Sequence, residues 1–180
     1  MRTKSLALSA LAALLVLAAA PGHAVRKDDA TRKSKNGRVE GSVGGAGVVI
    51  EYGRPNVNGR VIWGDLVPWG KVWRTGADEA TTIAFDRDVT IEGRPLARGT
   101  YSLFTLPGEK GWTVIFNKTA EQWGAFDYDA KQDALRVEVA PRAHEATETL
   151  TFSLEGNAVV LRWEKLEVAF RVAAGAASAG

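Results

Sequence analysis

The residues best suited to chemistry gather in one stretch of the chain, residues 54–79. It holds three arginines, three tryptophans and three carboxylates: Arg54, Arg60, Arg74, Trp63, Trp69, Trp73, Asp65, Asp78 and Glu79. Guanidinium groups bind carboxylates and phosphates in a fork and stack on indole rings. These nine residues are the predicted ligand-binding residues, for a small anion or a saccharide.

The alternative interpretation of the charged residues is structural. Each arginine has an acid nearby in the sequence, and ion pairs that pin a loop imitate binding sites. Arg74 and Glu79 flank a turn at Gly76 and Ala77, which would let their side chains meet. We therefore predict that Arg74 and Glu79 form a pair that holds the loop.

The tryptophans also allow two interpretations, a flat surface for a ligand or a plug at one end of the fold. A large apolar ring with one N–H suits a half-buried lid. Trp73 is expected to be the plug, and Trp69, between proline and glycine, to be exposed on a turn. Trp112 and Trp163 lie in predicted strands and are expected in the core, while Trp123 is left open.

Carboxylate pairs hydrolyse glycosides when two of them face one sugar ring. Asp78 and Glu79 are adjacent, and neighbouring side chains of an extended chain point in opposite directions. A glycosidase-like hydrolase would therefore use Glu79 with Asp65 or Asp78, which makes it an alternative function without an assigned catalytic residue.

The composition excludes several classes of site. The chain has no cysteine and two histidines, His23 and His144. Thiol nucleophiles, thiolate metal sites and zinc sites with several histidines are excluded. The glycines of the stretch at 54–79 are not followed by the Gly-Lys-Ser/Thr ending of a phosphate-binding loop. No metal and no cofactor are predicted.

The first 24 residues have the form of a secretory signal peptide. Arg2 and Lys4 precede an uncharged run over residues 6–20, and small residues lead up to Ala24. The run is shorter than the ~20 residues that span a bilayer. We expect cleavage after Ala24, export to the periplasm or beyond, and no transmembrane span in the mature form.

The charge is uneven along the chain, which has 23 Lys and Arg and 21 Asp and Glu. Removal of Arg2 and Lys4 with the leader would leave equal numbers of positively and negatively charged residues. Residues 25–38 are rich in cations and are expected to form a basic flexible tail. The remaining domain is acidic, which argues against a nucleic-acid partner.

Short runs with period-2 alternation recur along the rest of the chain, separated by Gly, Pro, Asn and Asp. They predict strands over residues 48–52, 81–85, 89–91, 100–106, 112–116, 134–139, 149–154, 159–164 and 166–172. Such strands without intervening helices indicate an all-β antiparallel sandwich or jelly-roll-like domain. We place this single domain at residues 39–172, with a long ordered Trp/Gly-rich loop and a disordered tail at 173–180.

Four motifs carry a resemblance to a known family. They are Tyr-x-Arg-Pro at 52–55, Gly-Arg at 59–60, Pro-x-Gly-x-x-Trp-Arg-x-Gly-Ala at 68–77, and Gly-Thr-Tyr-Ser-Leu at 99–103. The chain from 48 to 172 resembles the bacterial domain of unknown function 2911. Asp78 departs from that family's pattern, which usually has Asn there. The resemblance implies an exported, β-rich domain and supplies no activity.

The expected function is that of an exported, non-enzymatic binding or accessory module for a small anionic or saccharide ligand. The hydrolase described above is one alternative. The other is a structural envelope protein that assembles through an uncovered sheet edge. Convergence of Arg54, Arg60, Arg74 and Glu79 on one cavity would favour a site over a structural loop.

Overall fold

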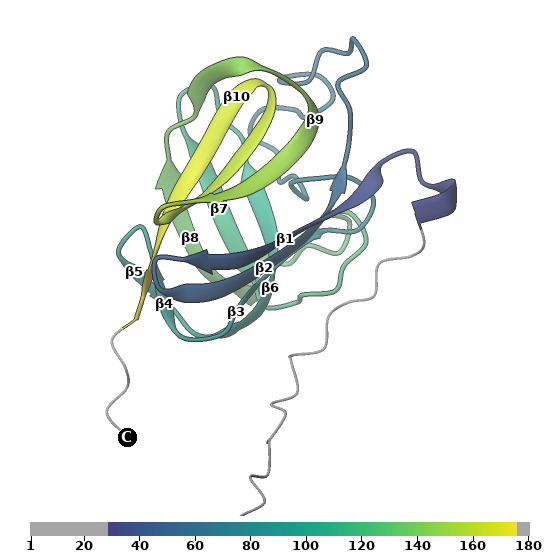
Figure 1. Cartoon of the computed structure of the whole chain (residues 1–180). Coiled ribbons are helices and arrows are strands. Elements are labelled where there is room, and N and C mark those ends of the chain that lie inside the picture. Colours follow the sequence, from purple (N-terminus) through teal and green to yellow (C-terminus); the bar gives the residue numbers. More distant parts are fainter. Residues whose placement is uncertain (1–28, 176–180) are drawn as a thin grey trace, which may run out of the picture.

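The computed structural model describes residues 29–175, which form two antiparallel β-sheets in a sandwich (Figure 1). The larger sheet has the strand order β1-β2-β3-β6-β7-β8 and the smaller one β5-β4-β10-β9. The strands are β1 (Lys35–Val43), β2 (Ala46–Arg54), β3 (Thr81–Phe85), β4 (Val89–Ile91), β5 (Arg94–Leu96), β6 (Gly99–Leu106), β7 (Trp112–Asn117), β8 (Asp133–Val139), β9 (Arg142–Glu155) and β10 (Ala158–Ala174). Two short 3-10 helices are η1 (Asp29–Thr31) and η2 (Ala130–Gln132). The predicted all-β sandwich is confirmed.

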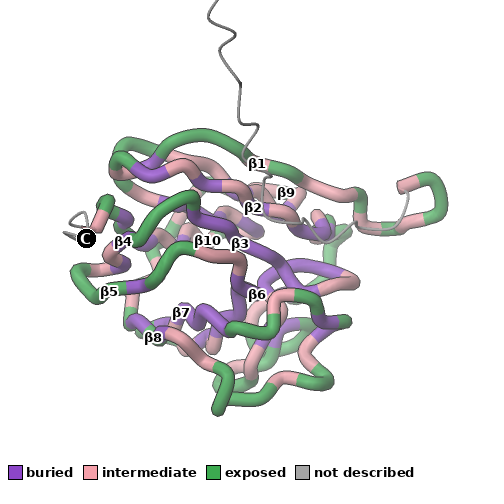
Figure 2. Tube along the Cα trace, turned by 90° about the horizontal axis from the view of Figure 1, so that it is seen from below, coloured by how far each residue is buried: buried purple, intermediate pink, exposed green. Residues whose placement is uncertain are grey.

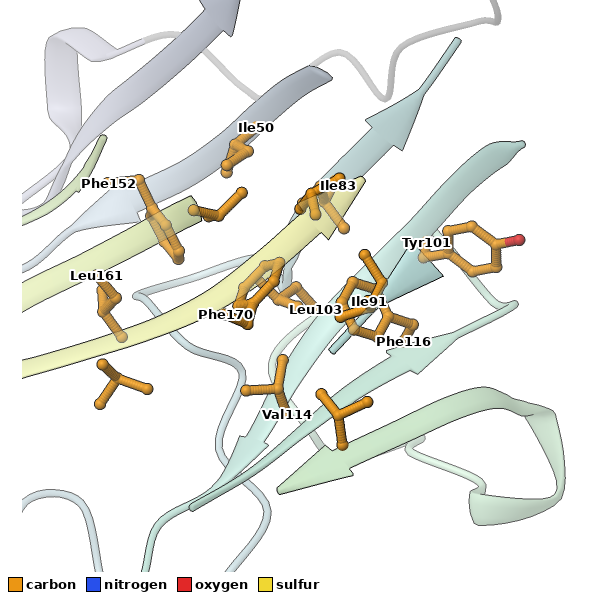
Figure 3. Packing of buried hydrophobic residues seen from close by; sticks show 14 of the residues in the cluster. Ile50, Ile83, Ile91, Tyr101, Leu103, Val114, Phe116, Phe152, Leu161 and Phe170 are labelled. Atoms are coloured by element: carbon orange, nitrogen blue, oxygen red, sulfur yellow. The ribbon is translucent and has the colours of Figure 1, made fainter. Parts of the chain in front are cut away.

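The alternation of side chains builds the core between the two sheets. Along β2, Val48, Ile50 and Tyr52 are buried and belong to the main core cluster. Figure 3 shows Ile50 of β2 among core residues of both sheets. The ring of Tyr52 packs edge-on against Phe152 at 4.8 Å between centroids. The backbone N–H of Phe152 donates to the Tyr52 hydroxyl at 3.1 Å. The two sheets are therefore joined by a hydrogen bond as well as by apolar burial.

The middle strands of the larger sheet, β3, β6 and β7, are covered on both faces. All five residues of β3 are buried, and buried residues continue through β6 and β7, while β1 and β5 are mostly exposed (Figure 2). On the face turned away from the smaller sheet, a second cluster of Ala80, Phe104 and Ile115 packs against Val72 and Tyr128. Residues 72–80 and 122–128 thus form a cover over this outer face.

The first strand begins earlier than the sequence indicates. Residues 35–38, assigned to a flexible tail, open β1, and the Gly-rich segment at 41–47 forms the hairpin from β1 to β2. Gly44 and Gly45 both have positive φ at its turn, a conformation that favours glycine. Pairing with the edge of β2 satisfies the backbone of a segment with little apolar content.

The last strand is longer than expected. Two strands were predicted over residues 159–172, but β10 runs through them, with irregular pairing on both sides of Glu164, which has a φ of 55°. β10 continues to Ala174, inside the predicted C-terminal tail, and His144 lies within β9. The predicted signal peptide at 1–24 and residues 176–180 of the tail lie outside the described residues.

Arg162 ties together the parts of the β9–β10 hairpin on either side of this bend. Its guanidinium donates to Glu155 at 2.5 and 3.0 Å and to Glu167 at 2.8 Å. The hydrogen bonds from Arg162 and then from Ser153 lower the pKa of Glu155 to about 2. The carboxylate of Glu155 is 46% exposed, so solvent screens the attraction and its net effect on stability is below about 1 kcal/mol.

We expect this cluster to make stability depend on pH in the acid range. Because the folded pKa of Glu155 is depressed, its stabilisation is fully present above about 4.5 and is lost as pH falls towards 2. Arg162→Ala should therefore lose less stability than the wild type over that window. Urea unfolding at several pH values measures the difference. Lys110→Ala, at an exposed loop position, should follow the wild type, and parallel curves for Arg162→Ala would contradict the assignment.

Candidate functional site

The Trp loop, residues 55–80, connects β2 to β3 and is fixed to three parts of the fold. Trp73 exchanges two backbone hydrogen bonds with Thr105 of β6, at 2.8 and 2.9 Å. The N–H of Val57 donates to Glu148 of β9, and that of Ala80 donates to Gln122. The loop is therefore ordered by backbone contacts at both ends and in the middle.

The absence of a side chain at Gly53 allows the loop to lie directly on β2. A Cβ at that position would stand 2.2 Å from the carbonyl oxygen of Ala77, a contact that only a shift of the backbone could relieve. The glycine of the Tyr-Gly-Arg-Pro motif is therefore explained by packing, because the turn before β3 lies too close to β2 for a side chain at this position.

The tryptophans of the loop join two tryptophans of the sandwich core. Trp63 lies edge-on to Trp73, Trp112 and Trp163, with ring centroids 5.9, 5.1 and 5.7 Å away. Trp73, Trp112 and Trp163 are buried, in agreement with the plug and core interpretations. Trp69 stacks on Trp63 at 6.4 Å and is half-buried rather than exposed. This cluster closes one end of the sandwich.

Arg60 and Asp65 take no part in that cluster. The guanidinium of Arg60 donates to the carbonyl oxygens of Asn56 and Val57, so it closes its own turn. Asp65 is exposed, and no hydrogen bond or ion pair of its side chain is seen among residues 29–175. Neither side chain meets the acids before β3.

The acids before β3 are held by Arg32, a residue assigned to the flexible tail. Its guanidinium donates to Glu79 at 2.7 and 2.5 Å and to Asp78 at 3.3 Å. The side chain of Arg32 is only 8% exposed and that of Glu79 22%. The predicted pair of Arg74 with Glu79 is therefore wrong, because a cation 47 positions away in sequence occupies the carboxylate.

Unlike Arg32, Arg74 makes no ion pair with these acids. Its Nε atom is buried without a hydrogen-bond partner, and no ion pair of its guanidinium is seen within residues 29–175. Burial lowers the pKa of Arg74, and the charge of Asp78 opposes that shift in part. Arg54 has a buried Nε without a partner as well, and its side chain runs over Gly37, where a Cβ would stand 2.7 Å from its Cδ.

The backbone around Arg74 is strained. Thr75 and Asp78 have φ values of 56° and 62°, which non-glycine residues seldom adopt and which is unusual for a β-branched side chain. The buried hydroxyl of Thr75 meets that of Thr105 at 3.1 Å and donates to the carbonyl of Trp73 at 3.2 Å. Such strain occurs preferentially at binding sites and switches.

The predicted residues thus divide into separate groups instead of converging on one cavity. Trp63, Trp69 and Trp73 share the aromatic cluster, and Asp78 and Glu79 share Arg32. Arg54, Arg60, Asp65 and Arg74 have no side-chain hydrogen bond or ion pair to one another or to Glu79 within the described chain. A cavity of about 510 Å³ lies elsewhere, between β8, β9, β10 and the β4–β5 turn, and none of the nine residues lines it.

Comparison with family models adds the classification. A model described as protein of unknown function (DUF2911) matches residues 34–172. The chain belongs to the DUF2911 family. The DUF2911 match spans the Trp loop and reaches from the start of β1 to Val172 in β10, but Arg32 precedes it. The counter-ion of Glu79 is therefore supplied from outside the matched region of this DUF2911 protein.

Other comparisons and searches add little to the DUF2911 assignment. Comparison with curated proteins and with solved structures gives no significant match. Over the described range, none of the helices has the length and apolar character that a membrane span requires. In the same range, no group of three or more His, Asp or Glu is arranged to hold a metal ion.

Arg32 was not predicted from the sequence, because a run of cations next to a predicted leader is typical of a solvated tail. The signal that could have found it is the pair of adjacent acids, Asp78 and Glu79, which need a cation when the loop folds onto the sheet. The position of that cation along the chain has no signature, since it depends on where the residues before β1 lie.

Proposed function

We propose that this DUF2911 protein is an exported, non-enzymatic domain that binds a small anion, with Arg74 as the anchoring residue. Support comes from one observation, the partly buried guanidinium of Arg74 that has no ion pair in the described structure. The proposal retains Arg54, Trp63, Trp69 and Trp73 as the surroundings of that loop. Export rests on the signal-like segment at 1–24.

The physical reason is the cost of burying a charge. A buried cation without a counter-ion destabilises a fold, and proteins that keep one usually pair it with an acid. The neighbouring acids, Asp78 and Glu79, are bound to Arg32 instead. A carboxylate or phosphate from solution would supply the missing partner through charge-assisted, forked hydrogen bonds. Because Arg74 is only half-buried, a small anion has access to it.

Two alternatives, the hydrolase and a module for a neutral saccharide, receive less support from the same geometry. A hydrolase needs a carboxylate that is free to give or take a proton, and Glu79 is bound by two hydrogen bonds to Arg32. A neutral saccharide needs free aromatic faces, whereas Trp63 and Trp73 are engaged with other rings. A structural envelope protein would use a sheet edge, and the exposed first half of β9 offers one.

The test compares anion binding by the wild type, Arg74→Gln and Arg60→Gln, with inorganic phosphate and acetate as probes at constant ionic strength. An anion at a hundred times its Kd should raise the free energy of unfolding by about 2.7 kcal/mol. That rise should appear in the wild type and in Arg60→Gln, whose guanidinium only closes a turn, and vanish in Arg74→Gln.

The variant is also informative without any anion. If Arg74 is reserved for a ligand, Arg74→Gln should unfold in urea with unchanged or slightly higher stability, because an unpaired buried charge has been removed. A loss of more than about 2 kcal/mol, with no anion effect on the wild type, would assign Arg74 to the structure of the loop and reject the proposal.

A further inference from the structure

The sandwich is open along one side, where β8, β5 and the second half of β10 lie near one another (Figure 1). β9 pairs with β10 as far as Arg142 opposite Glu167, and β4 pairs with β10 from Val172 onwards. Residues 168–170 fall between the two ladders, and β8 is the last strand of the larger sheet. The cavity of about 510 Å³ occupies this opening.

Small and apolar residues shape the interior of the cavity. Ala140, Ala158 and Ala169 line it, so little side-chain volume enters the space, and Val139 and Phe170 supply the larger apolar surfaces. Phe170 is 4% exposed and belongs to the main core. A volume in this range is typical of small-molecule sites, which are mainly apolar with a few polar groups.

Three of the four charged residues on the lining are already engaged. Glu92 accepts from the backbone N–H of Arg171 at 2.6 Å and from its guanidinium at 2.7 and 3.0 Å. Glu138 accepts from the hydroxyl of Thr113 at 3.0 Å. The Glu92 carboxylate is therefore neutralised by Arg171, whereas the partner of Glu138 is a neutral hydroxyl.

Arg142 is the fourth, and its side chain has no hydrogen bond or ion pair within residues 29–175. The acid opposite it in the ladder, Glu167, is bound to Arg162 at 2.6 Å. The cavity therefore combines an apolar interior with one exposed cation that has no acid of its own.

We propose that this cavity binds an amphipathic anion, with its apolar body against Val139 and Phe170 and its carboxylate or phosphate head on Arg142. The charge selects the head, because Arg171 is paired with Glu92, whereas Arg142 has no acid bound to it within the described residues. The alanines select the body, because only an apolar group replaces water there without losing hydrogen bonds. This site is separate from Arg74 and does not depend on the anion site proposed above.

The experiment uses Arg74→Gln as the parent protein, so that the anion site proposed above takes up no carboxylate. This parent is titrated with octanoate and octyl phosphate, and with 1-octanol and acetate as matched probes that lack the head or the body. Calorimetry should detect both octyl anions, with octanol at least about tenfold weaker and acetate silent. The two anions distinguish a free fatty acid from a phosphate-bearing lipid as the source of the head. No binding of either octyl anion up to millimolar concentration would overturn the proposal.

Two variants test the two parts of the site. Arg142→Gln should weaken octanoate about tenfold and leave octanol unchanged. Ala169→Leu should fill the cavity and abolish the binding of both octanoate and octanol. Ala158→Leu provides a second filling variant if the first does not fold. Equal octanoate affinity in the parent protein and in its Arg142→Gln variant, or in a folded filling variant, would reject the site.

Discussion

Trp112→Ala is expected to lower the free energy of unfolding by about 3–5 kcal/mol, the range for truncating a large buried aromatic residue. Trp112 is fully buried in β7, and its ring meets those of Trp63 and Trp73 at 5.1 and 6.4 Å. Alanine would leave a void where the Trp loop joins the core. The total free energy of unfolding of a single domain is about 5–15 kcal/mol, so this loss is a large share of the stability.

Urea unfolding with linear extrapolation measures the change, and Trp123→Ala is the matched control. Trp123 is the same residue type but 53% exposed, so its truncation should change stability by no more than about 0.5 kcal/mol. Trp112→Phe should fall between the two, because most of the ring volume is kept and a buried indole N–H without a partner is removed. A loss below about 1 kcal/mol for Trp112→Ala would show that the cluster is not part of the stabilising core.

Arg32→Ala and Glu79→Ala are each expected to cost about 2 kcal/mol, between the values for exposed and for fully buried pairs. The two side chains are 8% and 22% exposed and share two hydrogen bonds, so removal of either leaves the other partly buried without its main partner. The double variant should cost much less than the sum of the singles. A coupling energy of at least about 1 kcal/mol is expected.

Two controls make this double-mutant cycle specific. Lys33→Ala removes the same charge from the neighbouring, exposed position and should change stability by less than about 0.5 kcal/mol. The change in the free energy of unfolding caused by Arg74→Ala should add to that of Glu79→Ala without a coupling energy. If Arg74 rather than Arg32 coupled to Glu79, the contact that anchors the segment before β1 would be contradicted.

The apolar framework of the sandwich was predictable because it rests on a local rule. Side chains on a strand alternate between its faces, so Ile83 and Phe85, or Val114 and Phe116, are assigned to one face from their spacing. Burial of Trp73, Trp112 and Trp163 follows from their type and their neighbours. The turn at Gly44 and Gly45 also lies within the sequence, but the Gly-rich composition around it concealed a strand.

Partner choice was decided by the tertiary structure alone. Sequence proximity favoured Arg74 as the partner of Glu79, whereas the segment before β1 places Arg32 on that carboxylate and leaves Arg74 without an acid. Charges attract over distance without regard to spacing in the chain, so no period or motif encodes which pair forms.

The cavity beside β8 was equally hidden from the sequence. Ala140, Ala158 and Ala169 occupy unremarkable positions in three separate segments, and only the bend of β10 and the open side of the sandwich bring them around one space. The sequence by itself determined most of the strands and their inward faces, because each depends on residues a few positions apart. The tertiary structure decided the ion pairs and the cavity, because both depend on which distant segments become neighbours.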